Sequence, residues 1–177
     1  MEEKLKDKEI REILISWLRA SGNEMRIYQE KAIGNAICDV LVVTDELIGY
    51  EIKSDSDTYT RLPRQIYAYN QFCDKNYIVI GKKHLKSVEE KVPNSWGIIC
   101  IDEVGINTLR TAKNNSQVSR RAQLSVLWKL ELKNILMKND MPLYAQKPKD
   151  YISKCIIEQI DEDLLKKQIA YELLHRD

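Results

Sequence analysis

The stretch GYEIKSD, residues 49–55, decides the fold because its centre places a glutamate and a lysine in a segment that otherwise has the composition of a buried strand. In an extended chain, residues i and i+2 point to the same face, so Glu51 and Lys53 project together. Tyr50 and Ile52 point to the opposite face. An exposed ion pair would contribute almost nothing to stability. The alternative is that the pair forms half of a metal-dependent phosphodiesterase site.

The sequence on both sides of this stretch predicts an α/β protein with an αβββαβ core followed by a further αβ unit. Apolar residues at helical spacing indicate helices, and short runs rich in β-branched residues between turn signals indicate strands. The expected elements are a helix from residue 5 to about residue 21, strands at 25–30, 36–43 and 47–53, a helix over 60–73, a strand at 77–81, a brief helix over 85–92 and a strand at 97–101.

The chain divides into a core, a linker and a helical tail. Residues 1–106 form the expected core, and the polar segment 107–119, which contains Asn114-Asn115-Ser116, is the expected linker. Residues 120–177 form an α-helical C-terminal extension that packs on the core. Its expected helices cover residues 124–137, 151–160 and 164–174.

Composition limits the classes of function. The 177 residues include 44% hydrophobic ones and carry a net charge of +1, so DNA binding would depend on local basic patches. The charged N-terminal segment and the lack of an apolar run of about 18 residues predict a cytoplasmic protein without membrane contact. Four dispersed cysteines without a C-x-x-C pair argue against a zinc ribbon and a disulfide framework. These are Cys38, Cys73, Cys100 and Cys155.

A second charge, Asp39, interrupts the preceding apolar strand ICDVLVV. If Val43 pairs with Leu47 across a three-residue loop, Asp39 lies opposite Glu51 and both carboxylates share a face. A two-residue turn would put them on different faces. Two carboxylates beside Lys53 suit a hard divalent cation, Mg²⁺ or Mn²⁺. The lysine can then orient the attacking water or stabilise charge in the transition state.

This arrangement resembles the PD-(D/E)XK nuclease superfamily. The segments GYEIKSDSDTYTRLPRQIYAYN, YIVIG and VPNSWGIICID resemble a small bacterial and phage-borne family of that superfamily with a GYEIKSD…RLPRQ signature. The resemblance covers residues 10–102, and LWKLEL at 127–132 is similar to the end of that family. It implies a restriction-endonuclease-like core with a mixed sheet.

The resemblance also implies roles for individual residues. Asp39 and Glu51 would be metal ligands and catalytic residues, with Lys53 as the catalytic lysine. Gln65 on the following helix would lie near the site, although a buried amide that packs against the sheet is an equal alternative. Glu30 matches an upstream acid of the family and would be a third metal ligand.

Three further positions have competing interpretations. Ile37 stands where the family has an arginine, which argues for reduced activity. Glu12 on the first helix competes with Glu30 as the third acid. Arg61 and Arg64 flank the start of the second helix, where they would bind the phosphates of the substrate or remain solvated.

The expected function is therefore that of a magnesium-dependent nuclease that hydrolyses phosphodiester bonds of DNA. One alternative is a catalytically inactive module with a nuclease fold, which binds nucleic acid or a protein partner. Another is a structural or regulatory protein whose acids lie on the surface. The expected partner is DNA, and the apolar tail helices would serve core packing, a homodimer or a helix–extended–helix DNA-binding module.

Overall fold

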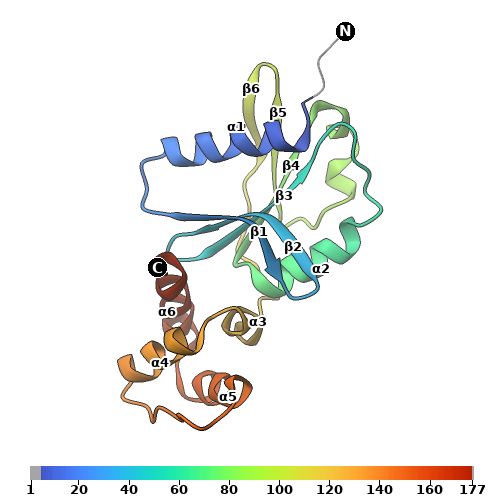
Figure 1. The fold of residues 1–177 in the computed structure, drawn as a ribbon. Helices are drawn as coiled ribbons and strands as arrows, with labels where there is room; N and C mark the ends of the chain where they lie inside the picture. Colours follow the sequence, from blue (N-terminus) through green and yellow to red (C-terminus); the bar gives the residue numbers. More distant parts are fainter. Residues whose placement is uncertain (1–4, 177) are drawn as a thin grey trace.

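The computed structural model describes residues 5–176 as six strands and six α-helices (Figure 1). No helix among the described residues is long and apolar enough to cross a membrane. The helices are α1 (Asp7–Ala20), α2 (Leu62–Phe72), α3 (Arg120–Ser125), α4 (Lys129–Lys138), α5 (Lys149–Gln159) and α6 (Glu162–Leu174). The strands are β1 (Arg26–Ile33), β2 (Ala36–Val43), β3 (Leu47–Lys53), β4 (Lys75–Ile80), β5 (Gly97–Asp102) and β6 (Gly105–Arg110).

The strands form one mixed sheet in the order β1-β2-β3-β4-β5-β6. β1, β2 and β3 make an antiparallel meander. Helix α2 then carries the chain to β4, which is parallel to β3 and to β5, and β6 returns antiparallel to β5. The mixed α/β class and the order of elements from α1 to β4 agree with the prediction from sequence.

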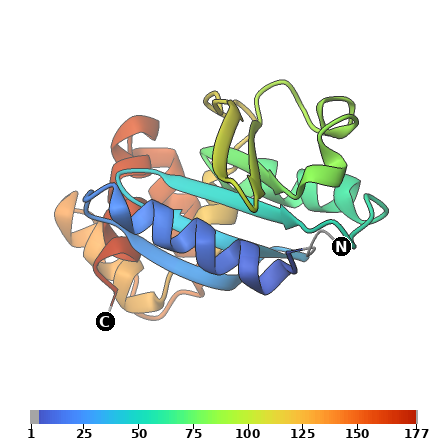
Figure 2. The ribbon, with the colours of Figure 1, turned by 90° about the horizontal axis from the view of Figure 1, so that it is seen from above.

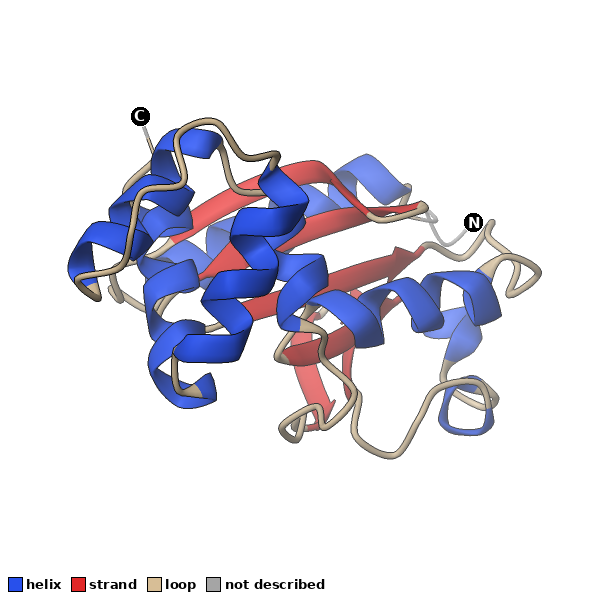
Figure 3. Cartoon of the chain, turned by 90° about the horizontal axis from the view of Figure 1, so that it is seen from below, coloured by secondary structure: helices blue, strands red, loops and turns tan. Residues whose placement is uncertain are grey.

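Successive side chains along the strands point to opposite faces of the sheet, and both faces are apolar. On β2, Val40 and Val42 pack under α1, together with Tyr50 and Ile52 of β3. Figure 2 shows α1 lying across this face. Leu41, Val43 and Leu47 belong to the larger cluster on the opposite face. Figure 3 shows α2 and the C-terminal helices over that second face.

Gly49, the first residue of the GYEIKSD stretch, lets α2 approach β3 closely. A Cβ atom at this position would lie 2.7 Å from the sulfur of Cys73 and 2.8 Å from the ring of Tyr69. Only glycine fits there without displacement of the helix. The contact brings the side chains of α2 directly onto the strand that carries Glu51 and Lys53.

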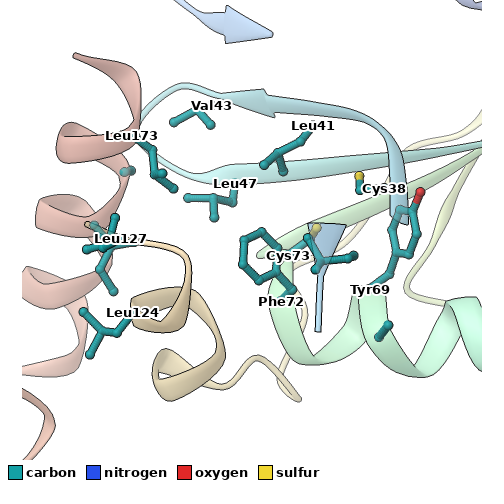
Figure 4. Close-up of a cluster of buried hydrophobic side chains, with 14 of the residues drawn as sticks. Cys38, Leu41, Val43, Leu47, Tyr69, Phe72, Cys73, Leu124, Leu127 and Leu173 are labelled. Carbon is teal, nitrogen blue, oxygen red and sulfur yellow. The ribbon is translucent and has the colours of Figure 1, made fainter. Parts of the chain in front are cut away.

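The C-terminal helices share their hydrophobic cluster with the sheet. Leu124, Leu127 and Leu173 meet Val43 and Leu47 in this cluster (Figure 4). Two buried ion pairs add polar contacts. Arg120 donates to Asp74 at 2.8 Å, and Arg176 donates to both carboxylate oxygens of Glu131 at 2.6 Å. The four cysteines are buried and have free thiols.

The expected helix over 85–92 is wrong. The structure has two short 3₁₀ turns there, η1 (Lys82–His84) and η2 (Val88–Glu90). The buried ring of His84 bonds to the carbonyl of Ser54 at 2.9 Å and packs edge-on against Tyr59. These contacts hold the segment against the loop after β3, so tertiary packing overrides the local helical pattern.

The expected linker over 107–119 begins inside β6, which includes residues 107–110. β6 is an edge strand with exposed or half-buried side chains, so it lacks the apolar alternation that would reveal it. The remaining residues are fixed to the core. Asn115 donates its side-chain amide to the carbonyls of Asn70 at 2.6 Å and Cys73 at 2.8 Å.

The single helix expected over 124–137 is two helices, because α3 ends at Ser125 and α4 begins at Lys129. Trp128 between them has extended backbone, with φ of −77° and ψ of 161°. The carboxylate of Glu131 accepts a hydrogen bond from the Trp128 backbone N–H. This cap begins a new helix instead of continuing the old one.

Candidate functional site

A pocket of about 850 Å³ lies beside β2 and β3, and side chains of α1 and α2 also line it. It contains nearly all of the polar residues that the sequence singled out. Those that line it are Glu30, Asp39, Glu51, Lys53, Arg61, Arg64 and Gln65.

The register of β2 and β3 confirms the three-residue loop. Val43 pairs with Leu47, and the ladder runs to Val40 opposite Tyr50. The pairing ends there, and the side chain of Asp39 accepts a backbone hydrogen bond from β3 instead. Its Oδ2 accepts the N–H of Ile52 at 2.8 Å. Asp39 is therefore placed at the opening between the two strands.

Tyr69 of α2 fills the same opening, and the sequence analysis missed it. Its hydroxyl accepts the N–H of Asp39 at 3.1 Å and donates to Glu51 Oε2 at 2.8 Å, with the Tyr50 carbonyl at 3.2 Å. Burial is the largest cause that raises the pKa of Tyr69 well above its usual value, so the hydroxyl stays protonated. Its sequence signal is its position four residues after Gln65, on the same side of the helix.

Glu51 and Lys53 form a buried ion pair. Lys53 Nζ lies 2.6 Å from Glu51 Oε1, and the side chains are 6% and 1% exposed, respectively. Gln65 Oε1 accepts a second hydrogen bond from Lys53 Nζ at 3.1 Å. With Tyr69 on its other oxygen, Glu51 has both oxygens occupied. The structure therefore supports the close association of Glu51, Lys53 and Gln65 that the sequence suggested.

Asp39 has an unusually high pKa for a carboxyl group. Burial, together with the charge of the neighbouring Glu51, raises the pKa of Asp39 to about 7, against the lowering effect of the Ile52 N–H. Its other oxygen, Oδ1, accepts no hydrogen bond from the described residues. A carboxylate of this kind gains most from a nearby cation, because the cation removes the repulsion from Glu51.

Glu30, the third metal ligand expected from the sequence, does not form a cluster of three acids with Asp39 and Glu51. Glu30 lines the pocket, but its side chain is 68% exposed and bound to Arg11 at 3.0 Å. Its backbone φ of 50° is left-handed, which is costly for a residue with a side chain. Glu12 lies outside the pocket lining, in an exposed pair with Lys8. No group of three or more His, Cys, Asp or Glu among residues 5–176 is placed to hold a metal.

Helix α1 instead contributes Asp7 and Arg11, which the sequence analysis did not select. Arg11 donates to Asp7 at 2.8 Å as well as to Glu30, and its guanidinium lines the pocket. Both belong to the helix that the apolar stripe predicted, but their polar positions look like an ordinary solvated face. Only the tertiary fold shows that this face reaches the pocket.

Arg61, the N-cap residue of α2, and Arg64, in the first turn of α2, stand at the rim of the pocket. Arg64 donates to the carbonyl of Asn35 at 3.0 Å and so links α2 to the turn between β1 and β2. Arg61 is exposed. Ile37 also lies on the rim, with 56% of its surface exposed. An apolar side chain thus stands where the resemblance leads us to expect an arginine.

The donors suit a magnesium or manganese ion. Mg²⁺ retains several waters and needs only one or two protein carboxylates, which Asp39 and Glu51 would supply. The lining of the pocket contains five acidic and four basic side chains. Without a cation, this balance is unfavourable for an anionic phosphodiester.

The fold and the site define an α/β protein with a six-stranded mixed sheet and a buried carboxylate–lysine pair that opens to a polar pocket. A family model described as bacteriophage P4 protein cII matches residues 1–176. The chain belongs to this phage-associated family.

Protein cII of Enterobacteria phage P4 is 27% identical to this chain over 144 residues, which cover 77% of the chain and 54% of that protein. The chain thus spans about half the length of this relative. Among solved structures, the SPO1766 protein of unknown function from Silicibacter pomeroyi is 21% identical. The superposition covers 55% of this chain and 64% of that one, with a TM-score of 0.43.

Proposed function

We propose that this protein is a metal-dependent nuclease that hydrolyses phosphodiester bonds of DNA, with a restriction-endonuclease-like core of the PD-(D/E)XK kind. One observation carries the proposal. Asp39 and Glu51, on neighbouring strands, line one pocket with Lys53, whose ammonium lies 2.6 Å from Glu51. A buried ion pair is costly to form, so its presence at a pocket favours a functional role over a structural one.

Asp39 and Glu51 would hold Mg²⁺ or Mn²⁺. When bound, such an ion provides a hydroxide-like nucleophile at neutral pH and neutralises charge on the phosphate. Lys53 stabilises negative charge that develops on the phosphate oxygens. Gln65 holds the ammonium in place through its 3.1 Å bond.

Arg61 and Arg64 bind the flanking phosphates at the rim of the pocket. Guanidinium groups suit phosphate because they donate two parallel hydrogen bonds. Both residues are exposed, and one of them is already oriented by its bond to Asn35. The acidic excess in the lining means that the cation must be present before the DNA strand can enter closely.

A second candidate function is that of an inactive module that binds nucleic acid or a protein partner. A specific observation favours it: both oxygens of Glu51 already accept hydrogen bonds, at 2.6 Å from Lys53 and 2.8 Å from Tyr69. A cation would have to share or replace these bonds. In the inactive module the same bonds would be permanent and purely structural.

Incubation of the protein with single-stranded, duplex and branched DNA, with and without magnesium, separates the two functions. We expect magnesium-dependent cleavage by the wild type and a rate at least about 100-fold lower for Asp39→Asn. Asp45→Asn, in the exposed loop between β2 and β3, is the matched control and should cleave like the wild type. Binding of DNA without cleavage of any form would favour the inactive module.

A further inference from the structure

A second pocket, of about 600 Å³, lies in the C-terminal helices between α3 and the beginning of α5. It shares no lining residue with the candidate active site. Lys149 and Ser153 from α5 line it, together with Arg121 and Ser125 from α3. The pocket is therefore a separate feature of the helical tail.

The first turn of α5 has no side-chain cap. Its N-cap residue is Pro148, which has no side-chain donor or acceptor. The N–H groups of Tyr151 and Ile152 bond to the Pro148 carbonyl, whereas the first two amides of the helix lack an intrahelical partner. These amides form the positive end of an 11-residue helix and are suited to an anion.

Ser153 is an independent sign of a ligand. It is only 4% exposed and lines the pocket, and its hydroxyl makes no hydrogen bond to another described residue. The oxygen is not fully enclosed, so it faces the open space of the pocket, where it can donate to a ligand. Ser153 is four residues after Lys149, so both side chains lie on the same side of α5.

The charges in the pocket also favour an anion. Lys149 Nζ donates one hydrogen bond to the carbonyl of Ser125 and retains two more donors. Burial is the main cause that lowers the pKa of Lys149, and a bound anion would offset it. Asp150 is the one acid in the lining, and Arg121 neutralises it through a 2.8 Å bond. The lining thus retains one unbalanced positive charge.

We propose that this pocket binds a phosphate group, held by the free amides at the start of α5, the Ser153 hydroxyl and the Lys149 ammonium. Phosphate has the several acceptor oxygens that such a set of donors requires. The source is either the backbone of a nucleic acid or a free phosphate, since both present the same group. The proposal does not depend on cleavage at the candidate active site.

The test is a titration of the ¹⁵N-labelled full chain with inorganic phosphate, followed by nuclear magnetic resonance at constant ionic strength without divalent cations. We expect saturable shifts of the Lys149, Asp150 and Ser153 amides. Ser153→Ala and Lys149→Gln should each weaken binding by about tenfold, because each removes a charge-assisted hydrogen bond. The matched control is Lys154→Gln, which removes the same charge from the exposed side of α5.

A second arm replaces phosphate with a short single-stranded oligonucleotide and identifies the source. Shifts of the same amides at lower ligand concentration than with phosphate would assign the site to a nucleic-acid backbone. Saturable shifts with inorganic phosphate alone would assign it to free phosphate. Absence of a saturable shift with both ligands overturns the proposal, as does equal affinity of Ser153→Ala, Lys149→Gln and Lys154→Gln.

Discussion

Replacement of Lys53 by methionine tests whether the carboxylate–lysine pair is as buried as the structure shows. Methionine is also unbranched and nearly as long, but it lacks the ammonium that lies 2.6 Å from Glu51 and 3.1 Å from Gln65. Glu51, whose side chain is 1% exposed, would then keep a single partner, Tyr69. Removal of one partner from a buried pair typically costs about 3–5 kcal/mol in unfolding free energy.

The remaining hydrogen bond from Tyr69 places the expected cost at the lower end, about 3 kcal/mol. For a chain of this size, about 1 kcal/mol lowers Tm by about 2–4 °C, so Lys53→Met should unfold about 6–12 °C below the wild type. Thermal unfolding followed by circular dichroism measures this shift. The matched control is Lys133→Met on the exposed side of α4, which should change the unfolding free energy by less than about 0.5 kcal/mol.

The double variant Glu51→Gln with Lys53→Met removes the unpaired charge as well. It should be more stable than Lys53→Met alone, because the cost lies mainly in the uncompensated carboxylate. Equal Tm values for Lys53→Met and Lys133→Met would refute the reasoning. The reasoning would also be refuted if the Tm of the double variant fell by the sum of the decreases caused by Glu51→Gln and Lys53→Met alone.

Three further predictions concern the sheet, the carboxylates and DNA. Gly49→Ala should cost about 1–3 kcal/mol in urea unfolding, because the new methyl group meets the Cys73 sulfur at 2.7 Å; an unchanged midpoint would contradict the close packing. The pKa of Asp39 is raised to about 7, mainly by burial, so the folded protein keeps a proton that the unfolded chain releases above about pH 4. The unfolding free energy of the wild type should therefore fall relative to that of Asp39→Asn between about pH 4 and pH 7. A difference between the two proteins that does not change with pH would contradict this prediction. The double variant Arg61→Ala/Arg64→Ala should lower the salt dependence of DNA binding by about one counterion or more, whereas an unaltered slope would show that these arginines do not contact phosphate.

The sequence predicted the central part of the sheet because short-range rules govern it. Strand periodicity and a three-residue loop fix Val43 opposite Leu47, and that register places Asp39 near Glu51. The apolar spacing that predicts α1 and α2 is an equally local signal. Pairings between neighbouring elements can be predicted in this way.

The parts that the sequence did not reveal depend on contacts between distant residues. Tyr69 looks like a core tyrosine of α2, and only the separation of β2 from β3 turns its hydroxyl into a partner of Glu51. From the sequence, Arg11 looks like a solvated residue. In the fold it donates a hydrogen bond to Glu30, which lies 19 residues later in the chain. β6 is exposed and polar, so its pairing with β5 leaves no apolar pattern in the sequence.

The most direct test of the account is calorimetric titration of the protein with Mn²⁺ at pH 8, because the proposed activity requires that Asp39 and Glu51 hold a cation. The account predicts binding at millimolar or better affinity, abolished in the double variant Asp39→Asn/Glu51→Gln. Affinity should also weaken from pH 8 to pH 6, since protonation of Asp39, with its pKa of about 7, competes with the metal. Equal binding of Mn²⁺ by the wild type and the double variant would contradict the assignment of these carboxylates.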